Sequence, residues 1–180
     1  MLKKQDTAKR SEVRHVRRFL VTRLPDGCLP SNPHDQIFDN YVPDSHLRFR
    51  KVRDPGNDER WYSIEKEKAE KVHTRIELSR EDYEALSHWR GRETRKNRYY
   101  LSAEGHDSTM DIFLGDLWGL NLWTVAFENA ADCADFEPHE DVILEITSDP
   151  FFFESNLVEM KISDVKDHLS QKKKGAESAS

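Results

Sequence analysis

The chain has 180 residues, of which 34% are charged and 36% hydrophobic, and its formal net charge is −6. This length suits one domain with a hydrophobic core and is short for two domains. The acidic balance argues against a nucleic-acid-binding protein, because such proteins usually carry an excess of Lys and Arg. No apolar run approaches the roughly 20 residues of a membrane-spanning helix, and the basic N-terminus lacks the apolar stretch of a secretory signal. The sequence therefore predicts a cytoplasmic protein with no membrane partner.

The first half of the chain reads mainly as strands. Residues 1–12 are polar and are expected to form a flexible N-terminus. Residues 14–24 (RHVRRFLVTRL) are rich in β-branched and aromatic side chains and end at the turn sequence Pro-Asp-Gly. Residues 46–52 and 72–78 alternate apolar and polar side chains, and residues 61–68 form the expected hairpin partner of the former. Alternation with a period of two predicts half-buried strands.

The second half adds helices to this pattern. Ser79, followed three residues later by Asp82, predicts a helix over residues 79–90. Further strands are expected over 97–105, 108–117, 120–129 and 141–149, and helical segments over 155–160 and 162–171. This order predicts an α+β fold with a mainly antiparallel sheet and a few peripheral helices. We expect one domain over residues 13–168 and a disordered C-terminal tail over residues 169–180.

Basic side chains recur at every second position of several predicted strands. Arg48 and Arg50 share one strand face, and so do Lys96 and Arg98, because alternate residues of a strand point to the same side. One interpretation is that these are the solvent-facing sides of an antiparallel sheet. The other is a barrel whose lumen is lined with bases and holds a polyanion such as a triphosphate, a nucleotide or polyphosphate.

Several segments follow one another in an informative order. They are RRFLVTRLPDG, LRFRK, RIELSREDYEAL, RKNRYY, MDIFLGDLWGLNL and EITSDPFF. This series resembles the CYTH family, also called triphosphate tunnel metalloenzymes, whose first strand carries Glu-x-Glu-x-Lys followed by Phe-Leu-Val. The resemblance implies an eight-stranded antiparallel, tunnel-like barrel that hydrolyses or cyclises triphosphates. It also implies that basic residues grip the phosphates while glutamates on facing strands hold Mg²⁺ or Mn²⁺.

The resemblance assigns the family's phosphate-gripping positions mostly to bases of this chain. The residues expected to bind the anion are Arg18, Arg48, Arg50, Arg75, Lys96, Arg98 and Lys66. Two registers remain open in the strand over residues 61–68, because the family's lysine corresponds either to Lys66 or to Glu65.

The chain departs from the family at the carboxylate positions. Six positions that usually carry glutamate in the family hold other residues here: Arg14, Val16, His73, Arg75, Thr124 and Ala126. Two acids match the family and are the remaining candidate metal ligands, Asp111 and Glu145. Without paired carboxylates the site should hold a divalent ion poorly, because Mg²⁺ sheds its water reluctantly and needs good oxygen geometry.

The sequence therefore predicts a CYTH-like domain that binds a phosphate-rich anion and lacks metal-dependent catalysis, a pseudoenzyme with no certain cofactor. The alternative is an active inorganic triphosphatase or adenylate cyclase with a rearranged metal site that uses Mg²⁺ or Mn²⁺. A third possibility is a structural domain whose tunnel is filled by its own ion pairs. The ligand and the oligomeric state remain open at this stage.

Overall fold

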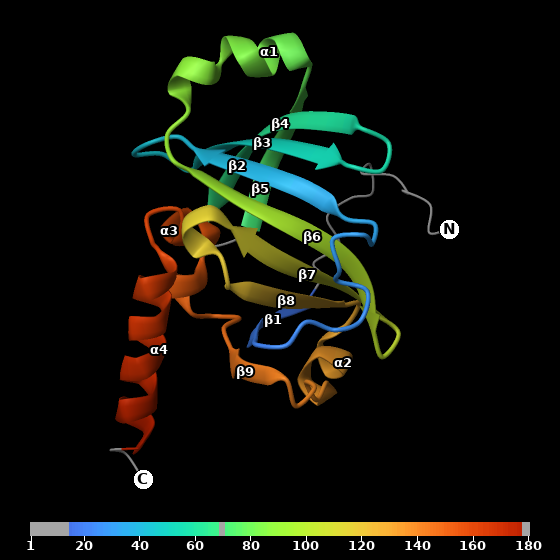
Figure 1. The fold of residues 1–180 in the computed structure, drawn as a ribbon, viewed down its shortest axis with the longest axis vertical. Helices are drawn as coiled ribbons and strands as arrows, with labels where there is room; N and C mark the ends of the chain where they lie inside the picture. The colour runs from blue at the N-terminus through green and yellow to red at the C-terminus, as the bar shows by residue number, and fades with distance from the viewer. Residues whose placement is uncertain (1–14, 69–70, 178–180) are drawn as a thin grey trace.

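One curved antiparallel sheet forms most of the structure (Figure 1). The computed structural model describes residues 15–68 and 71–177, without the side chains of residues 67, 68, 71–73 and 175–177. Nine strands are hydrogen-bonded in the order β5-β4-β3-β2-β6-β7-β8-β1-β9, and every pairing is antiparallel. The strands are β1 (His15–Val21), β2 (Asp35–Tyr41), β3 (Leu47–Asp54), β4 (Glu59–Lys68), β5 (Lys71–Leu78), β6 (Glu93–Ala103), β7 (His106–Leu114), β8 (Asn121–Phe127) and β9 (Val142–Glu145). The described strands β5 and β9 are the two edges, so the sheet is open.

The α+β class, with a mainly antiparallel tunnel-like sheet and few helices, is confirmed. The expected eight strands are nine, and the expected barrel is not closed. β2 was not predicted from the sequence, although it pairs with both β3 and β6. Its Ile37 and Phe38 lie on opposite faces, and Asp39 shares a face with Ile37, so the segment lacks an apolar face opposed to a polar one.

The helix α1 begins where the sequence predicts it. The backbone N–H of Asp82 donates to the Ser79 side chain at 3.0 Å, which makes Ser79 the N-cap. Tyr83 anchors α1 on the sheet, because its buried ring packs against Phe49 with 6.3 Å between ring centroids. The helices and 3-10 turns are α1 (Arg80–Ala85), η1 (Ser87–Trp89), η2 (Gly115–Leu117), α2 (Ala130–Asp135), η3 (Pro150–Phe152), α3 (Glu154–Leu157) and α4 (Ile162–Glu177).

Two hydrophobic clusters lie on opposite faces of the sheet. Phe19 and Leu20 are both buried, and as neighbours in β1 they point to opposite sides. Leu20 joins a cluster that includes Phe152 of η3 and residues of α3 and α4, whereas Phe19 joins one that includes Phe136 after α2. The C-terminal helices therefore cover one end of the face that carries Leu20 (Figure 1).

The helix α4 continues through most of the predicted C-terminal tail. Leu169 packs against the cluster around Leu20, and the Lys172 ammonium pairs with the Asp149 carboxylate. The expectation of a disordered tail is therefore wrong for residues 169–177, where the Lys side chains are compatible with a helix. The expected flexible N-terminus over residues 1–12 lies outside the described residues. None of the described helices is long and apolar enough to cross a membrane.

Candidate functional site

The register of the strands brings charged side chains together on one face of the sheet. Residues opposite each other in paired strands share a face, and Arg48 lies opposite Glu65, Arg50 opposite Asp39, and Arg98 opposite Asp111. We call this side, which also carries Leu20, the inner face, and the other side the outer face.

Most of the bases predicted to bind an anion lie on the inner face. Its basic residues are Arg18, Arg48, Arg50, Arg75, Lys96 and Arg98. Lys66 is corrected to the outer face: it lies opposite Leu47 and is exposed, whereas the side chain of its neighbour Glu65 is fully buried on the inner face. Adjacent residues of a strand point to opposite sides, which settles the two registers that the sequence leaves open. Arg14 lies outside the described residues.

Glu65 is the centre of the first group of ion pairs. It accepts hydrogen bonds from Nε of Arg48 at 2.8 Å and from Nε of Arg75 at 2.6 Å, and Nη1 of Arg50 lies 3.7 Å from its Oε2. Burial alone would raise the pKa of Glu65, but Arg50, Arg48 and Arg75 lower it to about 2. Glu65 is therefore ionised at neutral pH and neutralises bases that the sequence assigns to an external anion.

Asp39 of β2 holds Arg50 in a fork. Its two carboxylate oxygens accept from Nε and Nη2 of Arg50, each at 2.6 Å, and the Asp39 side chain is fully buried. Burial alone would lower the pKa of the Arg50 guanidinium, but the charge and the hydrogen bonds of Asp39 raise it. The bidentate geometry fixes the plane of the guanidinium as well as its position.

Asp111 of β7 organises the second group of ion pairs. It accepts from Nε and Nη2 of Arg98 at 2.6 and 2.7 Å, and its Oδ2 lies 2.9 Å from Nζ of Lys96. Burial alone would raise the pKa of Asp111, but Arg98 and Lys96 lower it to about 2. A second carboxylate, Glu154 of α3, contacts the same Lys96 ammonium. Arg18 lies at the covered end of the face, where its Nη2 donates to the Phe152 carbonyl at 3.4 Å.

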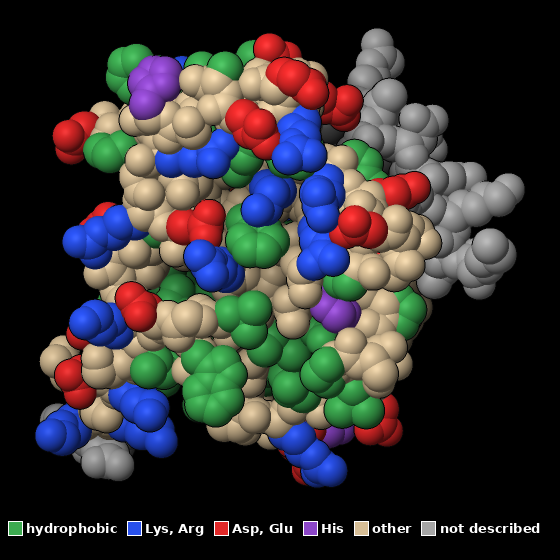
Figure 2. Space-filling model, turned by 45° about the horizontal axis from the view of Figure 1, so that its top comes forward, with side chains coloured by type: hydrophobic (Ala, Val, Ile, Leu, Met, Phe, Trp, Pro, Cys, Tyr) green, Lys and Arg blue, Asp and Glu red, His purple; other side chains and the backbone are tan. Residues whose placement is uncertain are grey.

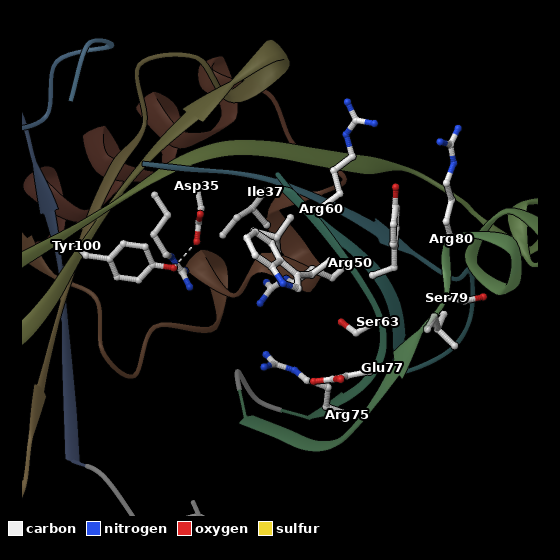
Figure 3. A pocket seen from close by; sticks show the side chains of 15 residues that line it. Asp35, Ile37, Arg50, Arg60, Ser63, Arg75, Glu77, Ser79, Arg80 and Tyr100 are labelled. Carbon is white, nitrogen blue, oxygen red and sulfur yellow. Dashed lines mark hydrogen bonds between the residues drawn. The ribbon is translucent and has the colours of Figure 1, made fainter. Parts of the chain in front are cut away.

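A cavity of about 860 Å³ opens on the inner face beside these pairs. Five arginines line it: Arg50, Arg60, Arg75, Arg80 and Arg98. The carboxylates on its wall are Asp35 and Glu77, and the Tyr100 hydroxyl donates to Asp35 at 2.7 Å. Figure 3 shows Arg50 and Arg75 pointing into the same space from β3 and β5. The cavity is therefore an arginine-rich recess whose guanidiniums come from separate strands.

The charged residues that the sequence missed are the partners of the bases. They are Asp39 on β2 and Glu154 on α3, while Glu65 was one of the two registers that the sequence left open. Asp35 on β2 was also missed, and it accepts from the Tyr100 hydroxyl. The only available signal was alternation in β2, where Asp35, Ile37 and Asp39 occupy every second position. Nothing in the local sequence indicates that Glu154, which belongs to a helix, reaches the inner face.

Neither a family model nor a curated protein matches this sequence. Solved structures with a similar fold include crystal structures described as those of the hypothetical protein NE1496 and the inorganic triphosphatase NE1496. They superpose with TM-scores of 0.61 and 0.60 at 23% identity, over 82% of this chain and 99% and 95% of those chains. The chain has the CYTH, or triphosphate tunnel, fold. At this level of identity the likeness concerns the fold, and the residues must be judged from this structure.

The CYTH resemblance places glutamate pairs on two strands that are neighbours here, β1 and β8. Val16 lies opposite Ala126, and Arg18 lies opposite Thr124. Val16, Ala126 and Thr124 lie on the inner face with Arg18 and Leu20 and occupy positions at which the resemblance expects carboxylates, whereas Arg18 takes the place of the family's lysine. The facing positions therefore offer no carboxylate oxygen to a cation.

The two remaining candidate metal ligands do not lie in one site. Asp111 is on the inner face, whereas Glu145 of β9 lies opposite Phe19 and therefore points to the outer face. There Glu145 accepts a bidentate pair of hydrogen bonds from Arg17, at 3.1 and 2.7 Å. Within the described residues no three His, Cys, Asp or Glu side chains are grouped so that they could hold a metal ion. The inner-face acids are bound to Arg and Lys, so the residues present do not fit Mg²⁺ or Mn²⁺.

Proposed function

We propose that this protein binds a phosphate-rich anion in the cavity of the inner face, without metal-dependent catalysis. The anion is a triphosphate, a nucleotide or a polyphosphate. The observation that carries this proposal is the convergence of arginines from separate elements on one recess of about 860 Å³. Arginine forks match phosphate oxygens, and a recess with low-dielectric walls strengthens their attraction for an anion.

The carboxylates behind the cavity prepare its arginines for a ligand. Asp39, Glu65 and Asp111 bind Arg50, Arg75 and Arg98 respectively from the buried side. A guanidinium has five N–H donors, so a bidentate carboxylate leaves donors for a second anion. Because the guanidiniums are already oriented, an anion does not have to order them, and the entropy cost of binding falls.

Isothermal titration calorimetry with sodium triphosphate, in EDTA and at low salt, tests this function. We expect the wild-type protein to bind, and the Arg75→Gln variant to bind about 10–100-fold more weakly, since it loses a charge-assisted hydrogen bond. Arg95→Gln is the matched control, because Arg95 is exposed and pairs with Glu93 rather than lining the cavity. Other Lys and Arg side chains gather on the molecular surface (Figure 2), so this control separates the cavity from general positive charge. If the wild-type protein does not bind triphosphate at low salt, the proposed function is refuted.

The free thiols support a cytoplasmic location for this activity. Cys28 and Cys133 form no disulfide, and the glutathione and thioredoxin systems inside cells keep such thiols reduced.

Triphosphate hydrolysis is the second candidate, because one of the matching solved structures is described as an inorganic triphosphatase. It requires Asp111 to exchange its bonds with Arg98 and Lys96 for a divalent ion. Phosphate release from triphosphate, measured with Mn²⁺ and with Mg²⁺, distinguishes the two functions. Release that disappears in Asp111→Ala would favour hydrolysis, and binding without release favours the anion-binding domain.

A further inference from the structure

Glu154 reaches the inner face from outside the sheet. It is the first residue of α3, a four-residue helix between η3 and α4, and its side chain is 8% exposed. The other three buried carboxylates of the network, Asp39, Glu65 and Asp111, all belong to strands. Leu157 at the end of α3 is fully buried and fixes the helix against the hydrophobic cluster.

The Glu154 carboxylate lies against two bases that do not line the cavity. Its Oε1 contacts the ammonium of Lys96, and its Oε2 lies 3.7 Å from Nη1 of Arg48. The side chains of Lys96 and Arg48 are 1% and 6% exposed. Arg50 and Arg98 line the cavity, whereas Lys96 and Arg48 do not. The row of inner-face bases thus continues beyond the residues that line the cavity. Glu154 neutralises these additional buried bases, Lys96 and Arg48.

The charge of Glu154 is stabilised by the same bases that the sequence assigns to an external anion. Burial alone would raise the pKa of Glu154, but Lys96, Arg48, Arg50 and Arg98 lower it well below its usual range. These four bases keep the buried carboxylate ionised, so its position is one at which they attract negative charge.

We propose that Glu154 occupies a phosphate subsite of the tunnel and so sets how many phosphate groups the protein accepts. A carboxylate and a terminal phosphate offer similar oxygen acceptors to an ammonium and a guanidinium. While Glu154 is in place, a ligand reaches Arg50, Arg75 and Arg98 but neither Lys96 nor Arg48. This assignment rests on the proposed function, because it subdivides the same site.

A chain-length series measured by calorimetry tests the subsite. Pyrophosphate and triphosphate are titrated in EDTA into the wild type and Glu154→Gln, a substitution that removes the charge holding this side chain on Lys96 and Arg48, so that a phosphate can displace it. For the wild type we expect little gain in affinity from pyrophosphate to triphosphate, because Glu154 blocks the next position. For Glu154→Gln we expect triphosphate to bind at least about tenfold more tightly than to the wild type, since a charge-assisted contact becomes available. Glu159→Gln is the control, because Glu159 is exposed and pairs with Arg92 on the surface.

The outcomes separate this inference from the function on which it rests. If neither polyphosphate binds the wild type or Glu154→Gln, the anion-binding function fails. If the wild type binds and Glu154→Gln gains nothing for triphosphate, only the subsite is refuted. A crystal structure of the wild type with triphosphate decides the question even if the variant does not fold. We expect phosphate oxygens on Arg50, Arg75 and Arg98 with Glu154 still on Lys96, and a phosphate on Lys96 beside an unmoved Glu154 would overturn the proposal.

Discussion

Replacing Glu65 by Gln should destabilise the protein more than any surface substitution of the same kind. The side chain of Glu65 is fully buried and is the common partner of Arg48, Arg50 and Arg75. Gln keeps the size of the side chain and one acceptor oxygen but removes the negative charge. Among the remaining described carboxylates near Arg48, Glu154 and Asp39 lie farther away, at 3.7 and 3.9 Å. The change therefore leaves buried positive charge with less compensation.

The size of this effect follows both from the pKa shift of Glu65 and from the general cost of breaking a buried ion pair. The pKa of Glu65 falls from 4.5 to about 2 on folding. At about 1.4 kcal/mol for each pKa unit, this shift corresponds to about 3 kcal/mol of stability at neutral pH. Breaking a buried ion pair by removing one partner costs about 3–5 kcal/mol, which agrees. For a domain of this size, about 3 kcal/mol lowers the midpoint of thermal unfolding by about 6–12 °C.

The effect should also depend on pH in a defined direction. Glu65 has a lower pKa in the folded state than in the unfolded state, so its contribution is complete above the unfolded pKa of 4.5. The contribution is lost as the pH falls through 4.5 towards the folded value of about 2, while the facing arginines remain charged. The stability difference between the wild type and Glu65→Gln should therefore be largest at neutral pH and shrink over that window.

Thermal unfolding followed by circular dichroism, at neutral pH and at several acidic values, measures this difference. The matched control is Glu145→Gln, because Glu145 also accepts two hydrogen bonds from an arginine but its side chain is 41% exposed. An exposed ion pair contributes about 0–1 kcal/mol, so the control should stay close to the wild type. Equal stability of the two variants at neutral pH, or a difference that grows on acidification, would refute the reasoning.

One further substitution and one truncation test the packing around the sheet. Tyr83→Ala should lower the free energy of unfolding, measured in urea, by about 3–5 kcal/mol, because it leaves a cavity between α1 and the sheet. Tyr100→Ala is the control and should lower the free energy of unfolding far less, because Tyr100 is exposed. A chain truncated after His168 should lose about 1–2 kcal/mol by the same measurement, because it removes the packed Leu169, and a chain truncated after Glu177 should match the full-length protein. An unchanged stability after the first truncation would contradict the assignment of α4 to the fold.

Local patterns in the sequence were sufficient to place most of the strands. The segment 46–52 was predicted from alternation and corresponds to β3, and the expected strands over 97–105 and 108–117 correspond to β6 and β7, which are joined by a turn at Glu104-Gly105. Both residues of that turn have positive φ, 51° and 89°, as a tight hairpin requires. β2 was not predicted because Asp35 and Asp39 point towards the interior, and their burial depends on partners in other strands. Local patterns cannot report partners that are distant along the chain.

The bases of the site were predictable from the sequence, but their counter-ions Asp39 and Glu154 were not. Arg48 and Arg50 stand out because they alternate with apolar residues, but the choice between Glu65 and Lys66 depends on a register of one residue. A shift of one position moves a side chain from one face of a sheet to the other. Glu154 could not be assigned at all, because its contact with Lys96 joins residues far apart in the chain and in different kinds of element.

The buried carboxylates explain how one fold can favour either a metal ion or an anion. A carboxylate that holds a divalent cation must turn its oxygens to the ion, whereas Asp39 and Asp111 turn theirs to guanidiniums in bidentate pairs. The two uses exclude each other at a given side chain. With Val16, Thr124 and Ala126 at the positions of β1 and β8 where the resemblance expects carboxylates, the carboxylates that remain serve to neutralise and orient bases. The balance of acids and bases on the inner face, rather than the shape of the sheet, therefore determines which ion the fold can hold.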